Sequence, residues 1–360
     1  MSKPMTEILR YPIRKNETLQ GWDSADELAL SHIKSQDLKD KKILIVNDQF
    51  GALSVGLEGF DFQTYTDSFV SFMGICQNTQ QKVMPLKNLN DLRGMFDYVL
   101  IQIPKNLSFF EDILAHLTHH LHKDSQVICM AMVKHLSPTS FDLLNKYIGQ
   151  TSTSLAQKKA RLIFANFEKT PVTSPFPLEV KIDGFDKNFI NHSNLFSREK
   201  LDIGTRFFLD HLPQGNFEKI LDLGCANGII GIKAKIINPK AQIYFSDESA
   251  MAIQSAEENY KNYHSDKAHF YWTNCFENQE REFLDLVLCN PPFHQQNTIG
   301  DFIAWQMFQD SFNALKKGGV LRVIGNSHLA YQVKLKKLFG NSQVIATNNK
   351  FMICESLKNF

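Results

Sequence analysis

The stretch "LDLVLCNPPFHQQ" (284–296) places an amide, two prolines and an aromatic ring directly after an apolar run. Asn290 offers a side-chain oxygen as a hydrogen-bond acceptor, and the carbonyl group of Pro291 offers a second one. Pro291 and Pro292 fix φ and donate no backbone hydrogen bond, so they hold the loop rigid and leave its carbonyl groups free. Pro291 also favours an extended Asn290, which projects the amide beyond the strand. This arrangement suits the binding of a planar amino group.

An exocyclic amine of a nucleobase is a weak nucleophile, because its lone pair is delocalised into the ring. Two acceptors can draw its N–H bonds out of the plane and direct the lone pair towards an electrophile. Phe293 offers a face on which a base can stack, worth about 1–3 kcal/mol. The motif does not choose between adenine N6, cytosine N4, guanine N2 and a protein glutamine amide. His294, Gln295 and Gln296 either contact a base edge or are ordinary surface residues.

Other apolar stretches of the C-terminal half also end in glycine or polar residues. Asp222 and Gly224 belong to "LDLGCANGIIG" (221–231), Asp247 follows the next strand, and Asn274 lies in "TNCF" (273–276). Asp247 can accept both hydroxyl groups of a ribose, and Asn274 can reach an adenine amine. Taken singly, the glycines are often needed for packing alone, Asp247 is more commonly a helix N-cap, and Asn274 is most often a turn residue. Their order at successive strand ends favours one ligand site at one edge of a sheet.

A dinucleotide site is the first alternative for the glycine-containing turn. The spacing of Gly224, Ala226, Gly228 and Gly231 partly matches G-x-G-x-x-G. Asp222, however, precedes the turn, where it would repel a pyrophosphate. A ligand that carries an amine or a sulfonium and no phosphate suits this position better, and S-adenosyl-L-methionine is such a ligand.

The elements that must position these residues are strands alternating with helices. We expect strands near 219–223, 242–246, 269–273, 284–289, 320–324, 343–346 and 351–355. A terminal hairpin after this alternation predicts a mostly parallel, doubly wound sheet with one antiparallel edge strand. Residues 197–212 are expected to form a helix that Ser197 caps.

The chain looks internally duplicated. "KKILIVNDQFGALSVGL" (41–57) resembles "EKILDLGCANGIIGIKA" (218–234), and "FDYVLIQIPK" (96–105) corresponds to "LDLVLCNPPF" (284–293). We therefore expect an α/β protein of two doubly wound domains, residues 1–167 and 197–360. Residues 168–196 contain several prolines and little periodicity, which predicts a linker.

The first domain is expected to be non-catalytic. It keeps an acid at Asp67, but its turn retains only Gly51, and Lys105 stands where the amine-binding loop is expected. We expect this domain to hold the substrate. The candidate contacts, each of which taken alone is more ordinarily a solvated charge, are Lys105, Lys134, His135, Lys158, Lys159 and Arg161.

Composition sets broad limits. The 360 residues carry a formal net charge of +1, which neither indicates nor excludes a nucleic-acid partner. The six cysteines form no CxxC pair, so we expect buried free thiols in a reducing compartment and no metal site. The sequence shows no apolar leader and no membrane-spanning run, which predicts a cytoplasmic protein. Its oligomeric state stays open.

The motifs "LDLGCANG", "SDES", "TNCF" and "NPPF" resemble those of class I S-adenosylmethionine-dependent methyltransferases that modify exocyclic amines. "LFSREKLDIGTRFFLDHLP", "NPPFHQQ" and "IATNNKF" more narrowly resemble the ribosomal RNA guanine-N2 methyltransferases, in which a degenerate methyltransferase-like domain precedes an active one. The resemblance implies two tandem Rossmann-like domains and a ribosomal RNA substrate. The branch acting on large-subunit (23S) RNA is favoured over that acting on small-subunit (16S) RNA.

The resemblance also completes the expected site. The expected catalytic residues are Asn290, Pro291, Pro292 and Phe293, and the expected cofactor-binding residues are Phe196, Asp222, Gly224, Cys225, Ala226, Gly228, Asp247, Glu248, Asn274, Cys275 and Asn290. Ala226 departs from the family pattern, which has glycine there. At positive φ, alanine would strain this turn. Methylation of DNA adenine or of a protein glutamine, and a non-enzymatic RNA-binding relic, are the alternatives.

Overall fold

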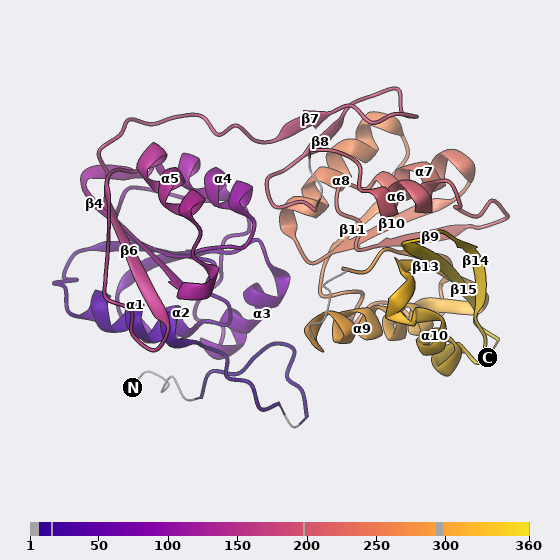
Figure 1. The fold of residues 1–360 in the computed structure, drawn as a ribbon, viewed down its shortest axis with the longest axis horizontal. Coiled ribbons are helices and arrows are strands. Elements are labelled where there is room, and N and C mark those ends of the chain that lie inside the picture. The colour runs from indigo at the N-terminus through magenta and orange to yellow at the C-terminus, as the bar shows by residue number, and fades with distance from the viewer. Residues whose placement is uncertain (1–6, 16, 197–198, 293–297, 360) are drawn as a thin grey trace. The chain divides into compact units, whose positions relative to one another are not determined.

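The computed structural model describes residues 7–15, 17–196, 199–292 and 298–359. Contacts divide the chain into two compact units, Met1–Phe176 and Pro177–Phe360 (Figure 1). We call them unit 1 and unit 2 and describe each separately.

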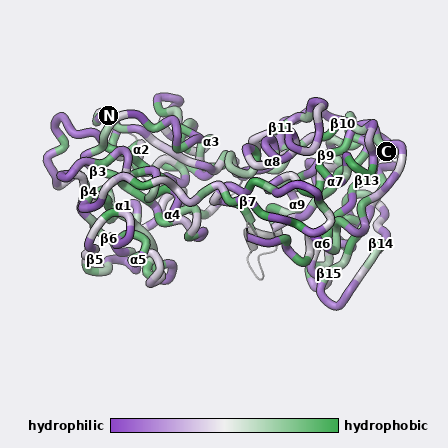
Figure 2. The backbone as a smooth tube through the Cα atoms, turned by 90° about the horizontal axis from the view of Figure 1, so that it is seen from above, coloured by the Kyte–Doolittle hydropathy of each residue, from purple (hydrophilic) through white to green (hydrophobic). Residues whose placement is uncertain are grey.

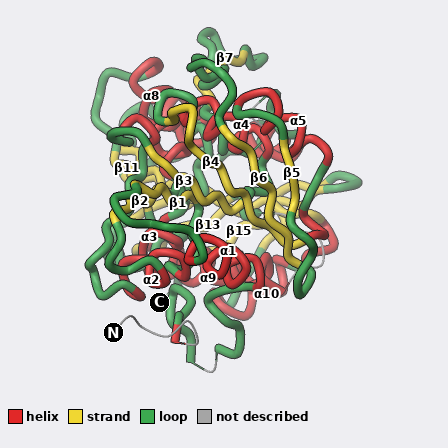
Figure 3. The backbone as a smooth tube through the Cα atoms, turned by 90° about the vertical axis from the view of Figure 1, so that its left-hand side faces the viewer, coloured by secondary structure: helices red, strands yellow, loops and turns green. Residues whose placement is uncertain are grey.

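Unit 1 is a three-layer α/β structure. Its sheet has the order β2-β1-β3-β4-β6-β5. The helices α4 and α5 lie on one side of this sheet, and α1 and α2 lie on the other (Figure 3). The strands are β1 (Lys42–Val46), β2 (Asp61–Tyr65), β3 (Phe96–Gln102), β4 (Leu121–Met132), β5 (Thr151–Thr153) and β6 (Ala160–Asn166). The helices are α1 (Ser24–Lys34), α2 (Ala52–Gly56), α3 (Phe69–Asn78), α4 (Leu107–Leu117) and α5 (Pro138–Tyr147), with short 3-10 turns η2 (Leu89–Asp91) and η3 (Val133–His135).

Unit 2 repeats this architecture with one more strand. Its sheet has the order β11-β10-β9-β12-β13-β15-β14. The strands are β9 (Lys219–Leu223), β10 (Gln242–Asp247), β11 (His269–Trp272), β12 (Leu284–Cys289), β13 (Leu315–Asn326), β14 (Gln343–Thr347) and β15 (Phe351–Leu357). The helices are α6 (Ile203–Leu209), α7 (Ile229–Ile237), α8 (Ala250–Tyr263), α9 (Thr298–Ala314) and α10 (Tyr331–Phe339), with a 3-10 turn η4 (Ser327–Leu329). One apolar core joins the sheet to α6, α7 and α8, and a second joins its other face to α9 and α10.

The central strands form because their residues are apolar on both faces, as in a sheet covered by helices on each side. Ile220, Leu221 and Leu223 of β9 are fully buried. Hydrophobic residues follow the strands inside each unit, while exposed turns such as that between β14 and β15 are hydrophilic (Figure 2). All six cysteines are buried free thiols, which confirms that expectation.

The antiparallel strand of unit 2 is not at the edge, where we expected it. β15 runs antiparallel to β13, and β14 pairs outside β15 in the antiparallel sense. The terminal hairpin therefore inserts its second strand next to β13 and leaves the first at the edge. The backbone groups of β13 are thus paired on both sides.

Two segments differ from their predicted conformation. The helix expected over 197–212 begins only at Ile203, because the Asp202 side chain accepts a hydrogen bond from the backbone of Thr205 and caps it. Ser197, the expected cap, lies outside the described residues. The expected linker contains a hairpin, β7 (Leu178–Val180) and β8 (Phe189–Asn191), which belongs to unit 2. Asn259 of α8 holds β8 through hydrogen bonds to both backbone groups of Ile190.

Among the described residues, no helix has the length and apolar composition that crossing a membrane requires.

Candidate active site

The structure places Asn290 immediately after β12, with its amide held from one side. The Asn290 Nδ2 group donates a hydrogen bond of 3.1 Å to Thr205 Oγ1 in α6. Asn290 Oδ1 is buried and accepts no hydrogen bond within the part of the chain that the structure describes. A buried acceptor without a donor costs about 1–3 kcal/mol. This oxygen is therefore available to a donor from a ligand.

Thr205 determines which end of the Asn290 amide is free. The sequence alone did not indicate that Thr205 belongs to the site. Its backbone N–H donates to Asp202 Oδ2 at 2.9 Å, and its hydroxyl group can donate to the same oxygen at 3.4 Å. A hydroxyl group that donates to a carboxylate presents its lone pairs to Asn290 Nδ2. The Asn290 amide is consequently oriented with its oxygen facing away from α6.

The rest of the expected catalytic loop is only partly described. Pro291 is buried and Pro292 is exposed. Phe293, together with His294, Gln295 and Gln296, lies outside the described residues. A Cβ atom at Gly224 would lie 3.8 Å from the Asn290 carbonyl oxygen, so the first turn approaches the end of β12 closely.

The glycine-containing turn between β9 and α7 has three residues at positive φ: Gly224 at 76°, Ala226 at 47° and Gly228 at 80°. This backbone points the Ala226 N–H at Asp247 Oδ2, 2.9 Å away. Asp247 Oδ1 also accepts from the backbone of Ser249, at 3.0 Å. Asp247 thus joins the end of β10 to the turn after β9. Alanine replaces the glycine of the family pattern at position 226, and its positive φ strains the turn.

Asp222 lies inside β9 and is completely buried. Its Oδ2 accepts from the backbone of Gly231 at 2.8 Å, while its Oδ1 has no hydrogen-bond partner among the described residues. Burial, with a smaller contribution from the charge of Asp247, raises the pKa of Asp222 well above its usual value. A side chain does not fit at position 231, because a Cβ atom there would come within 2.3 Å of the Phe245 ring. Glycine therefore lets the backbone approach Asp222 closely enough for this hydrogen bond.

Of the remaining expected cofactor residues, Cys225, Glu248, Asn274 and Cys275 follow the ends of β9, β10 and β11, and Phe196 follows β8. Asn274 is 8% exposed and donates to Glu277 Oε2 at 2.9 Å. Cys225 and Cys275 are buried, and burial raises the pKa of each thiol well above its usual value. They therefore stay neutral. The Glu248 carbonyl group accepts from Trp272 Nε1 at 2.8 Å, and Phe196 has an exposed ring, 66% accessible.

These features fit S-adenosylmethionine. The charge of Asp247 at this strand end suits a cationic ligand and disfavours a pyrophosphate, while the raised pKa of the nearby Asp222 favours its neutral form. The buried Oδ1 atoms of Asp222 and Asn290 are acceptors still available for donors. Within the described residues, no group of three or more His, Cys, Asp or Glu side chains is arranged to hold a metal ion.

Unit 1 contains the same turn in a closed form. The Asp48 carboxylate, in the turn after β1, accepts from the backbone N–H groups of Gly51 and Ser54, at 3.1 and 2.8 Å. Ile8 of the N-terminal segment packs on Phe50 and Val55. The chain's own side chains thus pack on this turn in unit 1.

The strand register corrects the interpretation of Lys105. Val46 of β1 pairs with Ile101 of β3, just as Leu223 of β9 pairs with Cys289 of β12. The residue equivalent to Asn290 is therefore Gln102, and Lys105 corresponds to Phe293.

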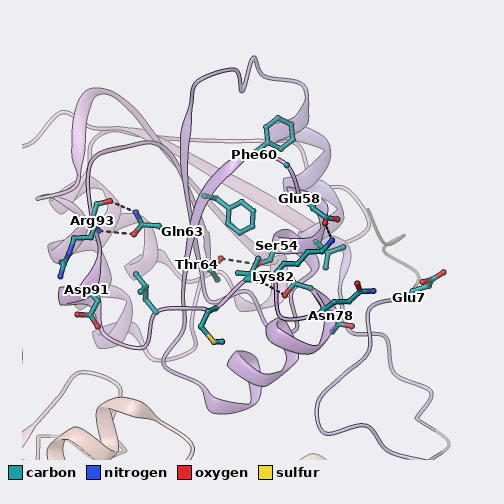
Figure 4. Close-up of a pocket in the computed structure, with 18 residues that line it drawn as sticks. Glu7, Ser54, Glu58, Phe60, Gln63, Thr64, Asn78, Lys82, Asp91 and Arg93 are labelled. Atoms are coloured by element: carbon teal, nitrogen blue, oxygen red, sulfur yellow. Dashed lines mark hydrogen bonds and ion pairs between the residues drawn. The ribbon is translucent and has the colours of Figure 1, made fainter. Parts of the chain in front are cut away.

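A cavity of about 780 Å³ in unit 1 lies elsewhere (Figure 4). Its lining residues include Phe60, Gln63 and Thr64 around the edge strand β2, together with Lys82 and Arg93 from the segment after α3. Because it runs beside the strand edge, it is not the counterpart of the strand-end site in unit 2.

The doubly wound sheet, the glycine-containing turn and the amide after β12 define unit 2 as a class I methyltransferase domain. Comparison with known proteins agrees: the family described as RLMG N-terminal domain matches residues 2–169, and the family described as Methyltransferase small domain matches residues 186–355. The chain belongs to the ribosomal RNA large subunit methyltransferase G family.

The relatives that establish this membership match nearly the whole chain. The Pseudomonas fluorescens (strain Pf0-1) ribosomal RNA large subunit methyltransferase G is 42% identical, covering 98% of this chain and 97% of its own length. The Shewanella putrefaciens protein of the same name is 41% identical, with the same coverage of both chains. The solved T. thermophilus 16S rRNA N2 G1207 methyltransferase, in complex with AdoMet and guanosine, has a TM-score of 0.80 over 94% of this chain and 92% of its own. It is 18% identical, so it shows a shared fold alone.

Proposed function

We propose that this chain transfers a methyl group from S-adenosyl-L-methionine to the exocyclic N2 amine of a guanine in large-subunit (23S) ribosomal RNA. The observation that carries the proposal is the buried Asn290 Oδ1, an acceptor that Thr205 orients and that the described protein atoms leave free. Such an atom fits an amine donor. The names of the relatives support the ribosomal RNA of the large subunit as substrate.

The chain's contribution to this reaction is to orient the amine and the donor. The cofactor supplies an already activated methyl group on a sulfonium. Asn290 Oδ1 accepts one N–H bond of the amine, and the Pro291 carbonyl group accepts the second, which directs the nitrogen lone pair out of the base plane. Asp247 would accept hydrogen bonds from the ribose hydroxyl groups of the cofactor, and Asp222, whose raised pKa favours its neutral form, would offer a polar group near the amino-acid end of the cofactor. Holding the two reactants in line accounts for most of the acceleration expected of such a site.

Unit 1 supports an RNA substrate through the position of its cations. Lys105 follows β3, Lys134 and His135 follow β4, and the backbone N–H of Val133 donates to the Lys159 carbonyl at 2.8 Å, which brings the turn before β6 to the same edge. Burial and the neighbouring charges of Lys134 and Lys105 lower the pKa of His135, so both lysines lie close to this histidine, which is neutral at pH 7. We call Lys105, Lys134, His135, Lys158 and Lys159 the basic edge of unit 1.

The basic edge fits a phosphate backbone better than it fits an internal ion-pair network. Lys158 pairs with Glu27, whereas Lys105, Lys134 and Lys159 are exposed. Clustered exposed lysines bind RNA by neutralising phosphates. Unit 1 accordingly holds the RNA and unit 2 modifies it, and the cytoplasm, where ribosomal RNA is processed, is the expected compartment.

Methyl transfer tests the proposal. Labelled S-adenosylmethionine is offered to separated large- and small-subunit RNAs that lack the modification, each protein-free and as assembled subunits. N2-methylguanosine in large-subunit RNA alone is expected. Label in small-subunit RNA would show that 16S RNA is the substrate. A methylated nucleoside other than N2-methylguanosine would show that a different amine accepts the methyl group.

The matched variant is Asn290→Ala. It should lower turnover on the order of 100- to 1,000-fold, with cofactor affinity nearly unchanged. Equal loss of turnover and cofactor binding would make Asn290 a structural residue.

A further inference from the structure

Asn326 ends β13, the strand next to β12, and it carries a second free buried acceptor. The residue is 9% exposed. Its Oδ1 atom is buried and has no hydrogen-bond partner in the described part of the chain. An amide oxygen in this state has no structural bond to maintain, and its burial is unfavourable until a donor arrives.

Asn326 and Asn290 lie on the same face of the sheet. In β12, Leu286 and Leu288 belong to the core under α6 and α7, and Asn290 continues this alternation. In β13, Ile324 belongs to the same core, so Asn326, two residues further, also faces that side. The neighbouring helix supports the same placement. Thr205 of α6 bonds Asn290. Phe351, the strand partner of Asn326, lies against Gly204 of the same helix.

The register sets the distance between the two amides. Cys289 pairs with Val323, so Asn326 lies two residues beyond the level of Asn290 on the adjacent strand. Strand spacing and rise then place the two Cα atoms roughly 8 Å apart. Two asparagine side chains from these positions can converge on one side of a single purine ring.

The chemistry of guanine matches this pair of acceptors. The Watson–Crick edge of guanine carries two adjacent donors, the N2 amine and N1–H, whereas adenine has a lone pair at N1. We propose that Asn326 Oδ1 accepts the N1–H group of the target guanine while Asn290 Oδ1 accepts from its N2 amine. Asn326 is then the residue that selects guanine among the bases with an exocyclic amine, an inference that rests on the proposed function.

The non-catalytic unit lacks this acceptor at the equivalent position. Ile101 pairs with Cys129 in unit 1 as Cys289 pairs with Val323 in unit 2, so the counterpart of Asn326 is Met132. Both residues end twelve-residue strands that lead into a 3-10 turn. The strand end therefore forms without an amide, and the amide of Asn326 serves a ligand.

The test compares guanine with 2-aminopurine, which keeps the 2-amino group but has no N1–H. The full-length chain, with cofactor present, is titrated with 2-aminopurine riboside by its fluorescence, and guanosine is measured by competition. Wild type should prefer guanosine, and Asn326→Leu should lower guanosine affinity about 10- to 100-fold while leaving 2-aminopurine riboside unchanged. Methyl transfer to ribosomal RNA, as kcat/KM, should fall by a similar factor.

Two controls separate recognition from folding. Asn326→Asp keeps an acceptor oxygen and should retain most of the guanine preference. The thermal unfolding midpoint of Asn326→Leu should be unchanged or raised, because Asn326 Oδ1 accepts no hydrogen bond from the residues that the structure describes.

The outcomes separate the inference from the proposed function. Unaltered kcat/KM in Asn326→Leu, or equal loss of affinity for both nucleosides, overturns the role of Asn326 while N2-methylguanosine formation by wild type stands. If wild type forms no N2-methylguanosine in any RNA, the proposed function fails, and this inference fails with it.

Discussion

Ala226 adopts a backbone conformation that residues with a side chain rarely take, at a φ of 47°. The conformation is required because the Ala226 N–H must meet Asp247, which links the first two strand ends of the site. An alanine in the left-handed conformation destabilises the folded state by about 1–2 kcal/mol. Glycine avoids this strain, but ordering its more flexible unfolded chain costs about 0.5–1 kcal/mol of the free energy of unfolding.

Ala226→Gly should therefore raise the free energy of unfolding by about 0.5–1 kcal/mol, measured by urea denaturation. Ala250→Gly, at the first residue of α8, is the control and should destabilise. If both substitutions destabilise alike, Ala226 is not strained.

Asp310 of α9 titrates in an unusual range. Burial raises its pKa to about 6, opposed by the hydrogen bond that the backbone of Phe276 donates to it and assisted by the nearby charge of Glu277. The unfolded pKa is about 3.9, so the folded state retains a proton that the unfolded chain releases between these values. The free energy of unfolding should accordingly fall as the pH rises from about 4 to about 6, with the contribution lost above that.

Asp310→Asn should remove this slope and raise the free energy of unfolding at pH 7.5 by about 1–2 kcal/mol, after allowance for partial solvent screening. The asparagine oxygen can still accept from Phe276. Urea denaturation at pH 4.5 and 7.5 measures the difference, and an unchanged slope in the variant would assign the pH dependence to other groups.

At the scale of elements, α6 positions the Asn290 amide although this helix lies far from β12 in sequence. Asp202 caps the helix and Thr205, one turn inside it, bonds Asn290 across 85 positions of the chain. The start of α6 is thus coupled to the orientation of the amide.

Thr205→Val keeps the shape of the side chain but removes the hydroxyl group, so the Asn290 amide can turn over. We expect kcat to fall at least about 10-fold with little change in KM for the cofactor. Thr205→Ser should restore kcat because it restores the hydroxyl group. A Thr205→Ser variant as slow as Thr205→Val would show that the methyl group, and hence packing, is what matters.

For the whole molecule, the two units share a topology but differ in chemistry. Unit 1 closes its glycine-containing turn with Asp48 and the N-terminal segment, and it gathers cations at the same end of its sheet. The two units thus share a topology, while the proposed roles, cofactor binding for unit 2 and RNA binding for unit 1, depend on different residues.

Replacing Lys105, Lys134 and Lys159 by alanine should weaken RNA binding and lower the slope of log affinity against log salt by about 2–3. Cofactor affinity, measured by calorimetry, should stay the same. Lys39→Ala with Lys123→Ala, at the opposite end of the sheet, is the control. An equal loss of RNA affinity per replaced lysine in the control would mean that RNA binding depends on net charge alone.

Much of the fold was predictable because it depends on local patterns. The strands β9, β10, β11 and β12 were predicted within a residue of their ends, since buried parallel strands are continuous apolar runs. The terminal hairpin was predicted as a hairpin, but its place in the sheet was not. That place depends on which strand edge remains open to pair, a property of the assembled sheet.

By itself, the sequence determined the two-unit α/β architecture and the strand-end residues Asp222, Asp247 and Asn290. These follow from periodicity, glycine and proline geometry, which act within a few residues. Only the tertiary structure decided the partner of Asn290, the positive φ of Ala226, the place of Asn326 on the same face of the sheet as Asn290, and the gathering of the basic edge. Those features depend on packing between segments distant in sequence, and an amide is oriented by the partner that packing brings to it.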